Sequence, residues 1–245
     1  MSRWLPDRKR PRRTVWGADA QGVAWHGLAG ALALAAHGDE ARHALTEAAA
    51  AGTVDIVAGS DLAVHWVQQA PASTRSLPEL RLAAAARCAH LFGGAAGDWW
   101  VAGDWALQRP FVCSAVPRSV TAPLRQAASA ISLRLRWHSA WSVHTAARAA
   151  SLPDEGWCAL RTPRRVLLWH CSAGRVDAMT GFVTAPDASD AELAAQAAMH
   201  VQLESLVGRG DDGTAVHWTA IGGELPPREA EAALLAGARL AGAPA

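Results

Sequence analysis

The chain of 245 residues carries a formal net charge of +1, and 51% of its residues are hydrophobic. This length suits one bilobed domain or two small ones, and the apolar share is ordinary for a folded globular chain. The near-neutral charge provides no global field that favours nucleic acid, and no apolar run approaches the length that spans a bilayer, so we expect neither a nucleic-acid partner nor a membrane-spanning segment.

Cysteine usage and the N-terminal sequence indicate the cellular setting. The four cysteines are far apart, lie in apolar segments and form no CxxC pair, so we expect free buried thiols in a reducing cytosol. Residues 1–13 are rich in arginine and contain two prolines, which predicts a basic disordered tail. A solvated tail is the simpler interpretation, with contact to anionic lipid or nucleic acid as the alternative. No apolar stretch follows these basic residues, so a signal peptide is not expected.

The first half of the chain alternates strands with helices. Strands over Thr14–Ala18 and Gly22–Leu28 flank a polar turn, and the alanine-rich segment Ala29–Ala51 favours a short helix or a helix in two pieces. Helical spacing of apolar residues and the following Gly93-Gly94 predict a helix over Leu77–Phe92. The remaining predictions are strands over Thr53–Val57, Leu62–Gln68, Trp99–Leu107, Phe111–Val116 and Ile131–Trp137, and helices over Arg118–Ala130 and Ala140–Ala149.

The second half repeats this theme. Three strands are expected over Gly156–Arg161, Val166–Ser172 and Val176–Thr184. Asp187–Asp190 can cap a helix from Ala191 to Leu206, and a strand over Val216–Ile221 and a helix over Pro227–Ala241 follow. Each half thus has several strands followed by helix, strand and helix. This order predicts a duplicated α/β architecture, with an N-terminal lobe over residues 14–137 and a C-terminal lobe over residues 138–245.

Familiar catalytic motifs are absent from the sequence. It contains no GxSxG, HExxH, Walker loop or GxGxxG. His170 and Cys171 pair a base with a thiol, but adjacent strand residues point to opposite faces, so half-buried positions on a sheet are the simpler interpretation. The basic segment Arg161–Arg165 is expected in a hairpin turn, where a solvated turn competes with a phosphate site. We predict no catalytic residue and no metal site.

The order of these elements resembles a known family. The segments that carry the resemblance are Val54–Gln68, Leu77–Phe92, Phe111–Val116 with Arg118–Ala130, Ile131–Ala149, Gly156–Phe182 and Ile221–Pro226. Together they resemble the actin-like PilM proteins of type IV pilus assembly and the cytoplasmic domain of GspL in type II secretion, over most of Thr14–Ala241. The resemblance implies a bilobed actin-like fold of the duplicated ribonuclease H type, with mixed sheets flanked by helices.

The resemblance also implies a degenerate nucleotide cleft. Asp19-Ala20-Gln21 stands where the family has an Asp-x-Gly phosphate hairpin and lacks the glycine. His170–Gly174, with Ser172 and Gly174, corresponds to the second phosphate hairpin without its acidic residue, while Gly222 and Gly223 retain the adenosine segment. Phosphoryl transfer depends on a metal and on preorganised charge. We therefore expect no cofactor, with residual ATP binding left open.

The missing glycine and the missing acidic residue in the two phosphate hairpins favour a scaffold protein over an enzyme. The resemblance implies a non-catalytic adaptor of a type IV pilus or type II secretion machine, in the cytoplasm or peripheral at the inner membrane. Its implied partners are an inner-membrane component and the assembly ATPase, and a homodimer is a variant of this hypothesis. The alternatives are an active or nucleotide-binding actin-like ATPase or sugar-kinase relative, and an unrelated α/β enzyme that uses Cys171 or His170.

Overall fold

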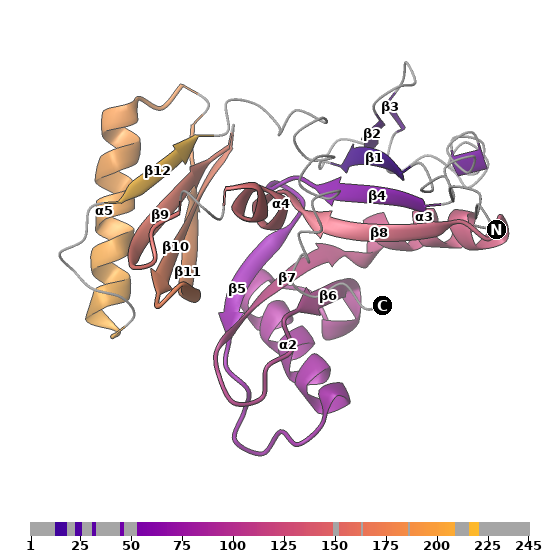
Figure 1. Ribbon diagram of the computed structural model, residues 1–245, viewed down its shortest axis with the longest axis horizontal. Helices are drawn as coiled ribbons and strands as arrows, with labels where there is room; N and C mark the ends of the chain where they lie inside the picture. The colour runs from indigo at the N-terminus through magenta and orange to yellow at the C-terminus, as the bar shows by residue number, and fades with distance from the viewer. Residues whose placement is uncertain are drawn as a thin grey trace, which may run out of the picture.

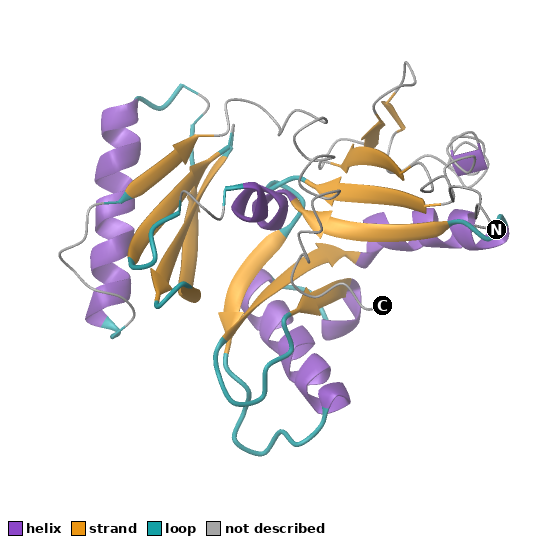
Figure 2. Cartoon of the chain, in the orientation of Figure 1, coloured by secondary structure: helices purple, strands orange, loops and turns teal. Residues whose placement is uncertain are grey.

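The computed structural model describes residues 13–18, 23–25, 31–32, 45–46, 53–148, 152–162, 164–185, 187–208 and 216–220. These residues form three sheets with their covering helices (Figures 1 and 2). Nearly all of the predicted basic tail, the turn after Ala18 and the predicted helix over Pro227–Ala241 lie outside the described residues.

The first sheet has five strands in the order β3-β2-β1-β4-β8. Strand β1 is antiparallel to β2 and parallel to β4, which is parallel to β8. Helix α3 packs its buried Leu124, Ala127 and Ala128 against this sheet, in a core shared with Val54 and Ile56. The strands span β1 Arg13–Ala18, β2 Val23–Trp25, β3 Ala31–Leu32, β4 Thr53–Ala58 and β8 Arg134–Ser139, and α3 spans Arg118–Ala130.

A smaller antiparallel sheet is inserted between β4 and β8. Its order is β5-β7-β6, and α2 covers one face. Leu80, Ala84 and Cys88 are four residues apart and therefore share the buried face of α2. The Ser76 side chain caps the start of this helix by accepting from the Glu79 amide. The elements span β5 Val64–Gln68, α2 Leu77–Phe92, the short 3-10 turn Ala96–Asp98, β6 Trp99–Gly103 and β7 Phe111–Pro117.

The second lobe repeats the topology of the first sheet. Its order, β11-β10-β9-β12, matches β3-β2-β1-β4, again with an antiparallel meander and one parallel pair. The predicted duplication is thus confirmed in the described residues. The elements span α4 Ala140–Ala147, β9 Gly156–Arg161, β10 Arg165–Ser172, β11 Arg175–Val183, α5 Asp190–Leu206 and β12 His217–Ala220.

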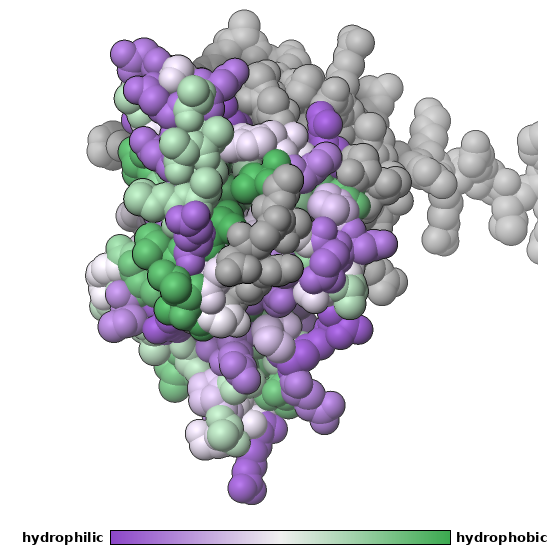
Figure 3. Space-filling model, turned by 90° about the vertical axis from the view of Figure 1, so that its left-hand side faces the viewer, coloured by the Kyte–Doolittle hydropathy of each residue, from purple (hydrophilic) through white to green (hydrophobic). Residues whose placement is uncertain are grey.

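Helix α5 covers the outer face of the second sheet. Ser189 caps it in a capping box with Glu192, within the segment that the sequence predicted as the cap. Leu193, Ala197 and Val201 pack beneath it on Trp157 and Leu168. The opposite side of α5 exposes apolar side chains, namely Met199, Leu203 and Leu206, and Figure 3 shows apolar surface among hydrophilic side chains on this side of the molecule.

One hydrophobic core joins the second lobe to the inserted sheet. It contains Val112 of β7, Trp141 of α4 and residues from the inner face of the second sheet, with Val67 of β5 packed against it. The Trp141 and Trp169 rings meet edge to face with their centroids 6.1 Å apart. His65 of β5 contacts Trp141 at a centroid distance of 5.6 Å. Helix α4 is therefore packed between the lobes (Figure 1).

Several predicted bounds differ from the described structure. The strand predicted over Trp99–Leu107 ends at Gly103, because Trp105 has a left-handed backbone with φ of 47°. The strand predicted from Ile131 begins at Arg134, since Ser132 has φ of 56° and the preceding residues close α3. Ala31–Leu32 forms a strand inside the predicted helical segment. Residues 137 and 138 both lie in β8, and the division into lobes over residues 14–137 and 138–245 stays a prediction.

None of the helices in the described ranges has the length and hydropathy needed to cross a bilayer. The four cysteines are free and buried, as the sequence predicted. Cys158 and Cys171 lie together in the core between the lobes, whereas Cys88 and Cys113 belong to the core under α2.

Candidate functional site

The parallel strands β4 and β8 of the first sheet direct their carboxyl ends toward the second lobe. In Figure 1 the arrowheads of β4 and β8 point toward the second lobe. Gly59–Asp61 follows β4, and the turn between β9 and β10 contains Thr162 and Arg164. Ligands of open α/β sheets bind outside the carboxyl ends of parallel strands. Both turns therefore lie at the ends where this architecture places a ligand.

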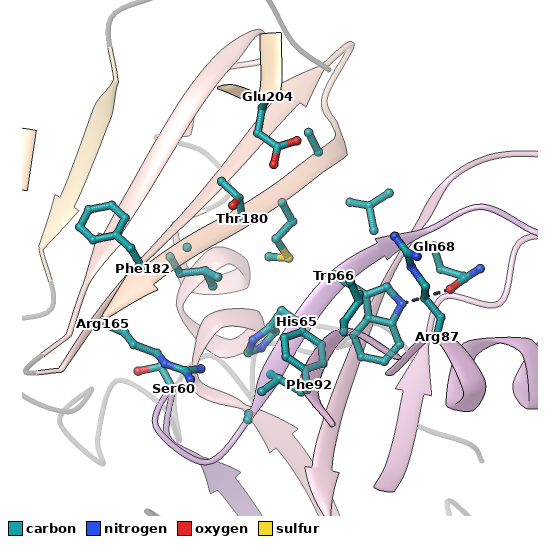
Figure 4. A pocket seen from close by; sticks show the side chains of 18 of the residues that line it. Ser60, His65, Trp66, Gln68, Arg87, Phe92, Arg165, Thr180, Phe182 and Glu204 are labelled. Atoms are coloured by element: carbon teal, nitrogen blue, oxygen red, sulfur yellow. Dashed lines mark hydrogen bonds between the residues drawn. The ribbon is translucent and has the colours of Figure 1, made fainter. Parts of the chain in front are cut away.

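A cavity of about 770 Å³ extends from these turns between the inserted sheet and the second lobe. One wall comes from β5 and the end of α2, including Trp66, Gln68 and Arg87. The other wall comes from β10 and β11, including Arg165 and Thr180, and Glu204 of α5 closes one side (Figure 4). The cavity therefore joins the edges of two separate sheets.

Both walls are edge strands in the described sheets. Strand β5 pairs only with β7, and β11 pairs only with β10. An edge strand presents backbone N–H and C=O groups that can pair with another chain. The residues of β5 are mostly buried, whereas Gly181 and Val183 of β11 are exposed. Of the two edges, β11 therefore has the more accessible backbone.

The charges in the cavity are unequally satisfied. The Asp177 carboxylate contacts His170 Nδ1 at 2.8 Å, and Glu204 also has an interaction of its own. Arg87 and Arg165 form no ion pair with any residue in the described ranges. Figure 4 draws these two arginines toward opposite ends of the cavity. The cavity lining thus carries two arginines and two carboxylates, and their formal charges balance.

His65 stands at the inner end of the cavity and is neutral. Burial, assisted by the positive charge of Arg165, lowers the pKa of His65 from 6.5 to about 3. Its Nε2 atom has no hydrogen-bond partner among the residues that the structure describes. Beside it, the Trp66 indole donates to the Gln68 side chain at 3.1 Å, and Gln68 donates in turn to the Gln69 carbonyl at 2.6 Å. These bonds hold Trp66 and Gln68 in fixed orientations.

The structure places Ser172 and Gly174 away from this cavity. They flank the β10–β11 turn, which lies beside the start of β9, because Cys171 pairs with Gly156. The Glu155 carboxylate accepts from the Ala173 amide at 3.2 Å, and the Asp154 carbonyl accepts from the Gly174 amide at 3.0 Å. The two turn amides that would face a phosphate are therefore already paired.

Topology gives a different counterpart for the first predicted hairpin. Strands β1 and β2 correspond to β9 and β10, so the turn after Ala18 corresponds to Arg161–Arg165. This basic turn stands at the carboxyl end of β9, opposite to Ser172 and Gly174. Asp19, Gly222 and Gly223 lie outside the described residues. A nucleotide role for all five predicted residues stays a prediction.

Arg161 has a structural role in that basic turn. Its guanidinium donates to Asp190 at 2.6 Å and to the Ala188 carbonyl at 3.3 Å, which attaches the turn to the start of α5. The solvated turn expected from the sequence is therefore only partly right. Arg164 is exposed, while the Arg165 side chain lines the cavity.

His170 and Cys171 point to opposite faces of β10, as the strand geometry predicted. His170 contacts Asp177 and packs at 5.3 Å from the Trp157 ring, whereas Cys171 faces the core between the lobes. The Cys158 thiol donates to Cys171, and with burial this raises the pKa of Cys158. Both residues are more deeply buried than the half-buried positions expected from the sequence. No base–thiol pair forms.

Sequence reasoning missed two histidine–carboxylate contacts. His170 meets Asp177 across the hairpin, and His138 of β8 meets Asp55 of β4 at 2.9 Å in a buried pair. Their only sequence signal is alternation along strands whose pairing was unknown. In the described part of the chain, no three His, Cys, Asp or Glu side chains are grouped closely enough to hold a metal ion.

Comparison with known proteins gives matches only at the level of structure. No family model and no curated protein matches the sequence. The cytoplasmic domain of EpsL, an inner-membrane component of the Vibrio cholerae type II secretion system, matches with a TM-score of 0.50 and 11% identity, covering 91% of this chain and 94% of that one. The PilM–PilN type IV pilus biogenesis complex matches with a TM-score of 0.54 and 12% identity, and the match covers 94% of this chain and 86% of that one.

A third matched structure has a fold that is already classified. A Bacteroides thetaiotaomicron protein with an actin-like ATPase fold matches with a TM-score of 0.51 and 8% identity, covering 96% of this chain and 90% of that one. The chain has an actin-like fold. At these identities the likeness extends to fold alone, and it confirms the α/β architecture and the structural resemblance predicted from the sequence.

Proposed function

We propose that this actin-like protein is a non-catalytic cytoplasmic adaptor of a type IV pilus or type II secretion machine. It connects an inner-membrane component to the assembly ATPase. The observation that carries the proposal is the core between the lobes, built around Trp141 and Trp169. Many enzymes close their domains around the ligand by a hinge motion. A shared aromatic core resists such a hinge and suits a rigid platform.

The comparisons support the same proposal. The matched EpsL domain belongs to an inner-membrane component, and the matched pilus structure is a complex of two proteins. Each match spans nearly the whole of this chain. A platform of this kind binds its partners through surfaces, and the cavity beside β5 and β11 is an available one.

One observation favours the alternative of a nucleotide-binding ATPase. The basic turn Arg161–Arg165 stands at the carboxyl end of β9, where phosphate ligands bind in open α/β sheets. Arg164 and Arg165 are free of ion pairs in the described residues, so they are available to phosphates. Under this alternative the chain hydrolyses Mg·ATP.

A pairwise binding experiment tests the adaptor proposal. The immobilised full chain is exposed separately to the purified cytoplasmic segment of the inner-membrane component and to the assembly ATPase, both taken from the pilus or secretion machine of the same organism. The proposal predicts saturable retention of each protein, and no retention on acid-unfolded chain. If neither protein is retained on the native chain and the chain releases phosphate from Mg·ATP, the ATPase alternative is established instead.

A further inference from the structure

We propose that the outer face of the second sheet, beside α5, is the docking site for segment 227–241 of the same chain, which covers this face as a second helix. The described part of the site is Trp218 of β12 and the flank of α5 that faces β12. Segment 227–241 lies outside the described residues, and its sequence predicts a helix. This docking is independent of the adaptor function.

The internal duplication assigns a position to this segment. In the first lobe, Leu45 before β4 and helix α3 after it pack in one core on the same face of the sheet. In the second lobe, α5 precedes β12 as Leu45 precedes β4, and α5 is the helix that the described residues place on the corresponding face. The counterpart of α3 follows β12 in the chain, as segment 227–241 does. The segment therefore corresponds to α3.

Trp218 shows that α5 alone does not cover this face. It pairs in register with Ala159 of β9 and stands two residues after Val216, and both of these residues pack in the core beneath α5. Residues two apart along a strand share a face, so Trp218 faces the α5 side of the sheet. Its side chain is nevertheless 39% exposed, whereas Val54 and Ile56 on the corresponding strand β4 are fully buried.

The flank of α5 that faces away from β11 can receive another helix. His200 stacks on Phe182 of β11 with ring centroids 4.9 Å apart, which fixes the side of α5 that faces β11. Ala194 and Ala198 lie on the opposite flank and are exposed. Their small side chains allow a neighbouring helix to approach closely. Together with Trp218, they form the apolar surface on which a second helix can pack.

The sequence of segment 227–241 repeats the buried pattern of α3. The contact of α3 with its sheet is made by a leucine and two small residues, namely Leu124, Ala127 and Ala128. A leucine and two small residues recur at the same spacing in the segment, as Leu234, Gly237 and Ala238. Residues at this spacing share one face of a helix. The segment therefore carries the side chains with which α3 packs on the first sheet.

The lengths of the connection and of the segment also suit this position. Six residues join Ala220 at the end of β12 to Pro227. When extended, six residues reach about 20 Å. The 15 residues of segment 227–241 form a helix about 22 Å long, which is close to the length of the 17-residue α5. The segment can therefore lie along α5 over most of its length.

Thiol labelling of the full chain tests this docking. Ala198→Cys and Leu203→Cys place a thiol on different flanks of α5, at positions that are both exposed in the described structure, while the four native cysteines are buried. The probe is N-ethylmaleimide, and mass spectrometry follows the modification of each site. We expect labelling at position 198 to be at least tenfold slower than at position 203. Equal rates at the two positions would overturn the proposal.

Two variants of the segment locate the protection. Leu234→Asp places a charge on the face that docks, and it should raise the labelling rate of Ala198→Cys to that of Leu203→Cys. Ala236→Asp introduces the same residue on the opposite face of the helix and should leave the rate low. Protection that persists in Leu234→Asp, or that is lost equally in both variants, would overturn the proposal. Protection that is lost on dilution of the protein would assign this surface to a second copy of the chain instead.

Hydroxyl-radical footprinting provides a readout that needs no introduced cysteine. Trp218 should be oxidised at least fivefold more slowly in the native chain than in Leu234→Asp. Phe92 of α2, which is 38% exposed, is the matched control and should be oxidised at the same rate in both chains. The same rate at Trp218 in both chains would show that segment 227–241 does not cover β12.

Discussion

Trp141 on α4 and Trp169 on β10 meet edge to face, with ring centroids 6.1 Å apart and planes inclined at 82°. The two residues are 28 positions apart in the chain and belong to the helix between the lobes and to the second sheet. Both are buried, and their contact lies within the core that also includes Val112 of the inserted sheet. This pair therefore couples three parts of the molecule through packing alone.

Removing Trp141 should destabilise the protein and loosen the lobes. Trp141→Ala leaves a large cavity in the shared core and should lower the free energy of unfolding by about 3–5 kcal/mol. Urea unfolding followed by circular dichroism measures this loss. The control is Leu206→Ala, at an 82% exposed position on α5, which should change stability by less than about 0.5 kcal/mol. Equal losses in the two variants would contradict the shared core.

Stability should fall in mild acid because His65 and His144 are buried in their neutral forms. Burial lowers the pKa of His65 to about 3, with help from Arg165, and that of His144 to about 4, with help from Arg148. In the unfolded chain both protonate near pH 6.5. The stability that these neutral histidines contribute is therefore fully present above pH 6.5 and is lost as the pH falls toward 4. In this range each histidine lowers the free energy of unfolding by about 1.4 kcal/mol per pH unit.

A phenylalanine at position 65 should reduce this acid sensitivity. His65→Phe keeps an aromatic ring against Trp141 and removes the titrating group. The difference in unfolding free energy between pH 7.5 and pH 5.5, values chosen about one unit either side of the unfolded pKa, should shrink relative to the native chain. His90→Gln, at an exposed site on α2, serves as control and should leave that difference unchanged. An unchanged pH dependence in His65→Phe would show that His65 is not buried neutral.

Glycine 181 should tolerate no side chain. Gly181→Ala places a methyl group 2.7 Å from the Val166 carbonyl oxygen, a backbone atom that cannot move without disturbing β10. We expect a loss of about 1–3 kcal/mol in thermal or urea unfolding. Gly97→Ala is the matched control, because a Cβ atom there has no neighbour within 4 Å. A neutral Gly181→Ala variant would contradict the described pairing of β10 with β11.

Local patterns in the sequence predicted most of the elements. The apolar residues Leu77, Leu80, Leu82, Ala84, Cys88 and Leu91 predicted α2 with its observed bounds, although Leu77, Leu82 and Leu91 are exposed rather than on the buried face. The run Gly156–Arg161 predicted β9. The left-handed backbones of Trp105 and Ser132 escaped prediction, because neither residue type marks such a conformation as glycine does. Strand ends next to these residues were therefore misplaced.

The candidate site was harder to predict than the elements. Assigning His170–Gly174 to a phosphate hairpin used the order of segments, but the equivalence of β1–β2 with β9–β10 appears only from the sheet order. The cavity similarly depends on β5 and β11 meeting across more than a hundred residues of chain. Arg87 and Arg165 have no sequence signal that would join them. The periodicity of a segment indicates whether it is a helix or a strand, but not which distant strand it lies beside.

The most direct test of the non-catalytic proposal is the release of phosphate from Mg·ATP by the full chain. The chain is assayed at micromolar concentration over several hours, against a sample unfolded in acid. A rigid adaptor predicts the same background rate in both samples. Saturable hydrolysis that depends on magnesium and is lost in the unfolded sample would contradict the account.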